Sequence, residues 1–160
     1  MLERSFSLRP HYRDANYYLP NYKSTLWTLV LLADCKADPS DPRFLRPLDI
    51  IAARFHDADS RIFSIGKSHF PIPWLNGNMI YLLSYFDSGK KSMVDDAVAF
   101  FNRYQRFDDG DYRTPRSYPY FGNRSCYGSH TCYWGAAKLL KGLVHIPKGE
   151  RTRDANELIE

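Results

Sequence analysis

The stretch that decides the fold spans residues 76–104 and reads NGNMIYLLSYFDSGKKSMVDDAVAFFNRY. Its first part, Asn76 to Phe86, places apolar side chains at the spacing of an α-helix. Asp87-Ser88-Gly89 then supplies a helix stop, and the apolar residues of Ser92 to Tyr104 again recur at helical spacing. The pattern predicts two helices joined by a short turn, which form a helical hairpin.

A similar hairpin is predicted upstream. Residues 23–35 and 44–55 carry apolar side chains at helical spacing, and the turn at residues 38–42 separates them. We expect Asp41 to cap the second helix because Pro42 follows it, and proline is favoured in a first helical turn. Pro47 predicts either a kink in that helix or a later start.

A third copy follows the central hairpin. Superposing Leu31-Leu32, Leu82-Leu83 and Leu139-Leu140 gives offsets of 51 (82 − 31) and 57 (139 − 82) residues. The third copy begins at His130, and its second helix starts near Thr152. A period of this length with two helices per unit is typical of stacked repeats. We therefore expect an all-α fold of two and a half stacked hairpins over residues 23–160, after an N-terminal extension at residues 1–22.

Composition and charge narrow the class of protein. Hydrophobic residues make up 44% and charged residues 25% of the 160, as in an ordinary soluble domain. The net charge of +4 comes from scattered basic residues, whereas nucleic-acid binding needs a clustered stripe. Apolar runs fall well short of the ~20 residues that span a bilayer. With three cysteines and no apolar leader after Met1, we expect reduced thiols and a cytoplasmic location.

The chemically densest window is residues 125–135, which reads SCYGSHTCYWG. Cys126, His130 and Cys132 stand in a C-x3-H-x-C spacing, and thiolate and imidazole are ligands that zinc prefers. We therefore expect these side chains to bind zinc where the first helix of the third copy begins. A helix N-terminus also lowers the pKa of a nearby thiol.

Two alternatives concern the same residues. A fourth ligand, such as Asp111, His69 or Cys35, would make the zinc site structural, whereas an open position would make it catalytic. Without a metal, Cys126 and Cys132 would be small buried apolar side chains. His130 would then cap the helix or bond a backbone carbonyl.

Three features together resemble the terpenoid cyclase and protein prenyltransferase superfamily, which includes squalene cyclase-like proteins. They are the hairpin repeat, the corner Gln-x-x-Asp-Asp-Gly-x-Tyr at residues 105–112, and the segment at residues 131–140. The chain looks closest to a group of archaeal and bacterial members with similar segments, here Trp27-Thr28-Leu29, Gly77-Asn78 and His130 to Gly135. The resemblance implies an α/α toroid, of which this chain holds an incomplete part.

The resemblance also implies site residues. Protein prenyltransferases bind zinc through an Asp-x-Cys-Tyr motif at the mouth of a helix; Cys132 matches the zinc cysteine, Tyr133 follows it, and His130 replaces the aspartate. The later histidine ligand of that family has no counterpart up to Glu160. In the family the first helices surround an apolar cavity, which here would be lined by Trp27, Trp74, Trp134 and Tyr133. Ordinary packing between hairpins is the alternative for these rings.

The expected function follows from this resemblance. It is a prenyltransferase-like or terpenoid cyclase-like domain that binds an isoprenoid or other apolar ligand near zinc, with no catalytic residue assigned. The alternative is a non-catalytic helical repeat with a binding or structural role. Because an incomplete ring exposes an apolar face at each end, we also expect a second copy to complete it, unless the chain is a piece of a longer protein.

Overall fold

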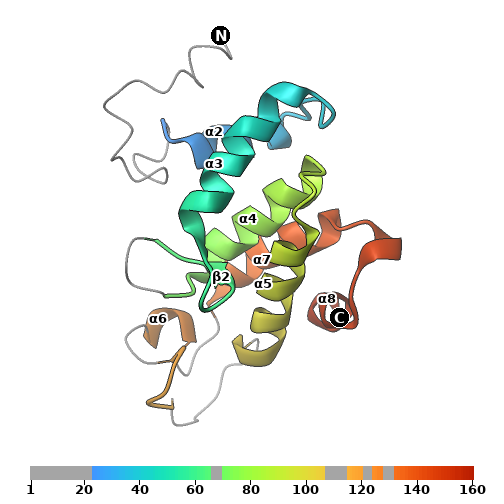
Figure 1. The fold of residues 1–160 in the computed structure, drawn as a ribbon. Coiled ribbons are helices and arrows are strands. Elements are labelled where there is room, and N and C mark those ends of the chain that lie inside the picture. Colours follow the sequence, from blue (N-terminus) through green and yellow to red (C-terminus); the bar gives the residue numbers. More distant parts are fainter. Residues whose placement is uncertain (1–22, 66–69, 107–114, 121–123, 128–131) are drawn as a thin grey trace.

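The computed structural model describes residues 23–65, 70–106, 115–120, 124–127 and 132–160 (Figure 1). This part is mostly helical and contains one short two-stranded sheet, which confirms the all-α prediction. The predicted N-terminal extension lies outside the described residues. Among the helices of the described part, none combines the length and the apolar character needed to cross a membrane.

Three helix pairs correspond to the predicted hairpins. They are α2 (Thr25–Asp34) with α3 (Leu45–Phe55), α4 (Pro73–Tyr85) with α5 (Lys91–Tyr104), and α7 (Tyr133–His145) with α8 (Arg153–Ile159). The 3₁₀ turns η2 (Pro42–Phe44) and η3 (Lys148–Glu150) precede α3 and α8, and the short helix α6 (Arg124–Tyr127) precedes α7. The predicted helices are therefore present, with ends that shift by a few residues.

The first helices of the three pairs pack in sequence order, with α4 in the middle. We call α2, α4 and α7 the inner helices: α4 contacts both α2 and α7, while α5 contacts α8. Figure 1 shows α7 behind α4 and α5, with α8 beside them. All side chains from Leu75 to Leu83 are buried. Helix α4 is consequently the centre of the core, and helices of the first and third hairpins pack against it.

Two glycines allow α4 and α7 to approach closely. A Cβ added to Gly77 would lie 2.5 Å from the carbonyl carbon of Lys138, and one added to Gly142 would lie 2.8 Å from the carbonyl oxygen of Gly77. The obstructing atoms belong to the backbone, so a larger residue would push the helices apart. These contacts fix the spacing between the second and third hairpins.

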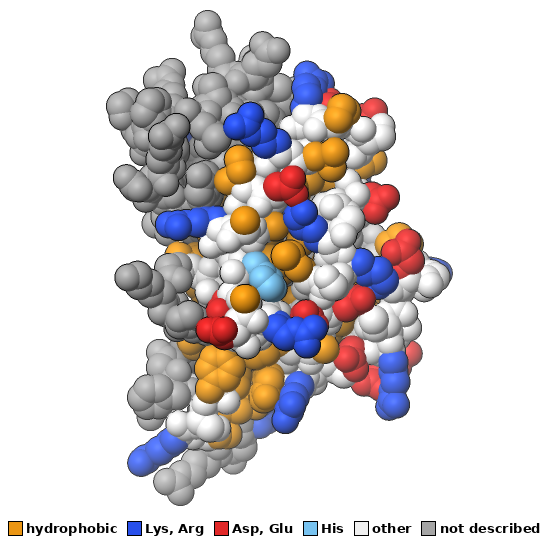
Figure 2. Space-filling view, viewed as in Figure 1, with side chains coloured by type: hydrophobic (Ala, Val, Ile, Leu, Met, Phe, Trp, Pro, Cys, Tyr) orange, Lys and Arg blue, Asp and Glu red, His pale blue; other side chains and the backbone are white. Residues whose placement is uncertain are grey.

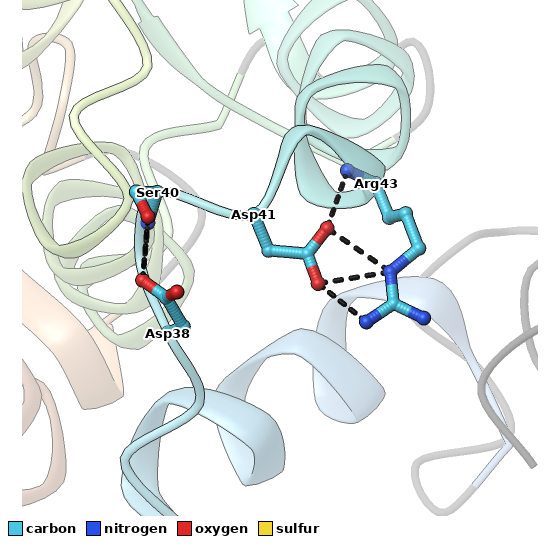
Figure 3. Close-up of polar contacts among 4 residues, drawn as sticks. All are labelled: Asp38, Ser40, Asp41 and Arg43. Carbon is cyan, nitrogen blue, oxygen red and sulfur yellow. Dashed lines mark hydrogen bonds and ion pairs between the residues drawn. The ribbon is translucent and has the colours of Figure 1, made fainter.

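The turn between α2 and α3 is built by two aspartates (Figure 3). Asp38 accepts hydrogen bonds from the backbone N–H and the hydroxyl of Ser40, at 2.9 and 2.7 Å. Asp41 accepts from the backbone N–H of Arg43 at 2.9 Å and so caps η2, while it also pairs with the Arg43 guanidinium. Helix α3 begins only after this turn. Pro47 therefore lies in its first turn, which confirms a later start.

A short β-hairpin fills part of the connection between α3 and α4. Strand β1 (His56–Asp57) pairs antiparallel with β2 (Ile62–Phe63). The Asn76 side chain in α4 accepts a hydrogen bond from the Phe63 N–H at 2.9 Å and donates to the Phe63 and Ile72 carbonyls at 2.7 and 2.9 Å. Strands of two residues are too short to show an alternating pattern, so the sequence does not predict them.

One carboxylate connects the three inner helices. Asp34, the last residue of α2, accepts hydrogen bonds from the Tyr81 hydroxyl of α4 at 2.9 Å and from the Lys141 ammonium of α7 at 2.5 Å. The Lys141 ammonium also lies 4.2 Å from the centre of the Tyr81 ring. Burial raises the pKa of Asp34, but the hydrogen bonds and charge of its partners outweigh burial, so the pKa is lowered overall.

Candidate functional site

Cysteines of the predicted zinc segment lie at the end of α6 and the start of α7. Cys126 belongs to α6 and is 6% exposed, whereas Cys132 is the N-cap residue of α7 and is partly buried. The two thiol groups are hydrogen-bond partners. The structure thus brings together two of the three predicted metal ligands. The third, His130, lies outside the described residues.

The thiol of Cys132 is unusually acidic. Its hydrogen bond with Cys126 is the largest cause, burial acts in the opposite direction, and the backbone N–H of Gly135 adds a further lowering. Together they lower the pKa of Cys132 from 9.0 to about 6. Gly135 belongs to the first turn of α7, where backbone N–H groups lack acceptors within the helix. The contact between the Gly135 N–H and the Cys132 thiol does not count as a helix-cap hydrogen bond. These contacts favour the thiolate form of Cys132.

Helix α6 is anchored by buried hydrogen bonds. The Tyr127 hydroxyl donates to the Pro71 carbonyl at 2.6 Å, and the Tyr127 side chain is almost fully buried. The carbonyl of Cys126 accepts from the Gln105 side-chain amide at 3.5 Å, which ties α6 to the end of α5. These contacts hold the position of Cys126.

A chain of aromatic rings supports the same region. Figure 2 shows hydrophobic side chains gathered toward the lower end of one face, between α6 and the C-terminal end of α5, while charges of both signs are interspersed above them. Tyr104 contacts Phe100 and Tyr120, with ring centres 4.8 and 6.3 Å apart, and Tyr120 contacts Tyr127 at 6.3 Å. The rings join α5 to α6 and add to the support of Cys126.

The start of α7 is fixed by its packing against the start of α4. A Cβ added to Gly135 would lie 2.4 Å from the Cβ of Pro73 and 3.2 Å from the sulfur of Cys132. Glycine is therefore required where α7 passes both Pro73 and the thiolate. This packing positions Cys132 beside the start of α4.

The described metal-ligand candidates, Cys126 and Cys132, suit a metal such as zinc that binds sulfur. Two neighbouring cysteine sulfurs, one of them with a lowered pKa, are ligands that zinc prefers. Within the described ranges, no group of three or more Cys, His, Asp or Glu residues is arranged so that it could hold a metal ion. Asp111 and His69, the suggested additional ligands, fall outside those ranges, and Cys35 is exposed at the C-cap of α2. The described residues thus supply two ligands, and His130 stays a prediction as the third.

A groove of about 460 Å³ lies between α7 and the C-terminal part of the chain. Its lining includes Tyr133, Ala137, Leu140 and Leu143 of α7, together with Leu158 and Ile159 of α8. Two acidic residues, Glu157 and Glu160, also line the groove. Leu140 is 47% exposed, so solvent reaches this lining. The groove is an apolar site with carboxylates among its lining groups.

Among the four aromatic residues expected to line a cavity, Tyr133 lines this groove. Trp134 is 65% exposed, and the Lys138 ammonium lies 5.6 Å from the centre of its ring. Trp27 and Trp74 are partly buried and pack against the core. Sequence reasoning did not foresee the groove, because its lining comes from two helices. The available signal was the spacing of Tyr133, Ala137 and Leu140, which places them on one side of a helix.

Asn78 lies near the middle of α4, among its buried residues. The residue is 1% exposed, and neither its side-chain oxygen nor its side-chain nitrogen has a hydrogen-bond partner within the described part of the chain. Buried amides are usually paired, so this position carries a cost in stability.

Comparisons with protein-family models, with curated proteins and with solved structures found no match to the chain. Its function therefore has to be inferred from the groove and the thiol pair themselves.

Proposed function

We propose that the protein is an α/α-toroid-like binding domain that holds an apolar molecule of the isoprenoid class in the groove between α7 and α8. The observation that carries the proposal is the groove's volume of about 460 Å³ and its largely apolar lining. Small-molecule sites typically measure ~300–1,000 Å³ and have mainly apolar walls with a few polar groups. A hydrocarbon chain would gain free energy by leaving water for such a lining.

The carboxylates that line the groove favour a neutral isoprenoid over a negatively charged one. Glu157 accepts hydrogen bonds from Arg153 at 2.6 Å and from Asn102 at 3.0 Å, which hold its carboxylate in place. Glu160 contributes a second carboxylate to the lining. Carboxylates repel a diphosphate but accept hydrogen bonds from a hydroxyl group. The preferred ligand is accordingly a neutral isoprenoid such as an alcohol, rather than its diphosphate.

The experiment compares farnesol with farnesyl diphosphate as competitors of a neutral fluorescent dye, Nile red. We expect farnesol to displace the dye at a concentration at least ~10-fold lower than the diphosphate, a difference of ~1.4 kcal/mol. Leu140→Asp should abolish dye binding, because it places a charge in the groove. Leu45→Asp is the matched control, since Leu45 is also 47% exposed but belongs to α3. Equal losses in both variants, or tighter binding of the diphosphate, would contradict the proposal.

A second proposal concerns the thiol pair. We infer that Cys126, Cys132 and His130 hold zinc, and the contact between the two sulfurs supports this assignment. When bound, zinc would act as a Lewis acid and would lower the pKa of a thiol or water in an open position. The role of the two cysteines is to supply sulfur ligands from elements that are already positioned.

Metal analysis of tag-free protein tests the zinc assignment. We expect about one zinc per chain, lost in Cys132→Ser and reduced in His130→Ala. Cys35→Ser is the control, because Cys35 is exposed at the end of α2 and should not affect the metal content. A metal content well below one equivalent, together with unchanged stability of Cys132→Ser, would refute the assignment.

A further inference from the structure

We propose that the outward side of α7 is a dimer interface, on which α7 of a second copy of this chain packs in the parallel orientation. Seven large apolar side chains are exposed among the described residues, and four of them belong to α7. These four are Tyr133, Trp134, Leu140 and Val144, with exposed fractions of 69%, 65%, 47% and 48%. The inference does not rest on the proposed ligand, because the dimer requires no occupied groove.

Exposed apolar residues of α7 follow the spacing of a helix–helix contact. Tyr133, Ala137, Leu140 and Val144 are all exposed, and they stand at intervals of four, three and four residues. Such alternating intervals keep apolar side chains on one side of a helix, where a second helix can pack along them. We call these four residues the α7 seam. The seam runs almost the whole length of α7, so another helix of equal length would cover it, and a second α7 is such a helix.

The area of this surface suits a dimer. Interfaces of standard size bury ~800 Å² per partner, of which ~56–65% is apolar. An aromatic side chain can bury ~150–250 Å², so the exposed parts of Tyr133, Trp134 and the smaller seam residues offer roughly 400–500 Å² of apolar surface per copy. This is the apolar area that a standard interface needs. It also lies toward the upper end of the ~300–600 Å² found for the largest patch of a typical monomer.

The two flanks of the seam carry charges of opposite sign. Lys138 and Lys141, three residues apart on α7, form the flank toward α2, where Lys141 pairs with Asp34. The opposite flank is formed by α8, which contributes Glu157 and Glu160. A surface that is basic on one side and acidic on the other can complement a copy of itself. This self-complementarity is the reason for assigning the seam to a second copy of the chain.

The placement of these charges also selects the orientation of the pair. A two-fold axis parallel to α7 brings the basic flank of each copy against the acidic flank of the other. An axis across α7 would make the helices antiparallel and would place Lys138 opposite Lys138. Like charges that face each other across an interface disfavour the complex. In the parallel dimer, Lys138 of each copy therefore faces Glu157 and Glu160 of the second copy.

Sedimentation velocity of the full chain at increasing concentration tests the proposal. A reducing agent is present, so that the exposed Cys35 forms no intermolecular disulfide. We expect a reversible monomer–dimer equilibrium with a dissociation constant of roughly 1–100 μM, and no larger assembly, because a two-fold contact closes on itself. Val144→Asp should raise the dissociation constant at least ~10-fold, because it places a charge in the seam.

Leu45→Asp is the matched control, because Leu45 is 47% exposed but belongs to α3. Its dissociation constant should stay within ~2-fold of the unsubstituted value. A chain that stays monomeric at ~200 μM would overturn the proposal. So would assembly beyond the dimer, or a dimer that Val144→Asp and Leu45→Asp weaken equally.

A charge exchange tests the orientation. Lys138→Glu and Glu160→Lys should each weaken the dimer at least ~5-fold, because each puts like charges together at two symmetric places. The double variant should recover most of the affinity, since it restores opposite charges with their signs exchanged. Single variants that bind normally, or a double variant as weak as the singles, would overturn the parallel arrangement.

Failure of the dimer can be distinguished from failure of the proposed function. Val144 belongs to the seam but is not among the described residues that line the groove. At a concentration below the dimer dissociation constant, Val144→Asp should therefore bind Nile red like the unsubstituted protein, although it dimerises weakly. Leu140→Asp should lose both properties, because Leu140 belongs to the seam and to the groove lining.

Discussion

Two buried asparagines, two positions apart in α4, differ in whether their side-chain amides have hydrogen-bond partners. Asn76 makes three hydrogen bonds, which join α4 to β2 and to the residue before the helix. Asn78 is equally buried but makes none within the described part of the chain. An unpaired buried polar group costs ~1–3 kcal/mol, while a well-paired one contributes to stability.

This contrast predicts opposite effects of one substitution. Asn78→Leu should raise the free energy of unfolding by ~1–2 kcal/mol, because it removes an unpaired amide at nearly constant volume. Asn76→Leu should lower it by ~2–3 kcal/mol, because it leaves the Phe63 backbone groups unpaired. Urea denaturation of both variants measures the difference. Comparable destabilisation by the two would show that Asn78 has a partner.

Site residues could be anticipated only where they lie close in the sequence. Cys126 and Cys132 are separated by one short segment, so their spacing already suggested that they meet. Their hydrogen bond and unequal burial depend on Tyr127, Gln105 and Pro73, which no local pattern connects to them. The groove was unpredictable for the same reason, because α7 and α8 both line it.

At the scale of elements, the close contact between α4 and α7 depends on Gly77. Gly77→Ala should lower the free energy of unfolding by about 3 kcal/mol, because the new methyl group meets the Lys138 backbone. Gly149→Ala is the matched control, since open space surrounds that position, and its effect should stay within ~0.5 kcal/mol. Chemical denaturation provides the measurement. Similar stabilities of the two variants would show that the helices can separate at no cost.

Sequence patterns predicted the helices well because helical periodicity is a local property. The start of α8 after Thr152 is an example, since the Thr152 hydroxyl caps the helix by accepting from the Ala155 N–H at 3.2 Å. The start of α4 was less predictable. It lies at Pro73 rather than Asn76, because Asn76 is used to bind β2 and not to cap the helix. Competition between local capping and a distant partner is invisible in a single stretch of sequence.

For the molecule as a whole, Asp34 provides a link that depends on pH. Its pKa is lowered in the folded protein, so its contribution to stability is complete above the unfolded value near 3.8. The contribution is lost as the pH falls through the lower, folded pKa. The loss belongs to strongly acidic conditions rather than to physiological pH.

Asp34→Asn should lower the free energy of unfolding by about 1 kcal/mol at pH 7, a modest value because the pair with Lys141 is partly exposed. The difference from the unsubstituted protein should shrink progressively as the pH falls below 3.8, the ordinary pKa of an aspartate. Asp49→Asn breaks the pair with Lys90, whose carboxylate is more exposed than that of Asp34, and should have a smaller effect. Urea denaturation across this pH range tests both expectations. A difference that persists unchanged at low pH would show that the charge of Asp34 does not contribute.

The large sequence separation of Asp34 and Lys141 affects how the chain unfolds. In a linear array of repeats, each unit touches only its neighbours, so an end unit can open while the others stay folded. Here the first and third units share one carboxylate across the second, over 107 positions of sequence. Detaching either end hairpin therefore removes a contact from the opposite end as well. Local opening of either end hairpin therefore costs the free energy of this pair. We expect the three hairpins to unfold as one cooperative unit rather than one after another.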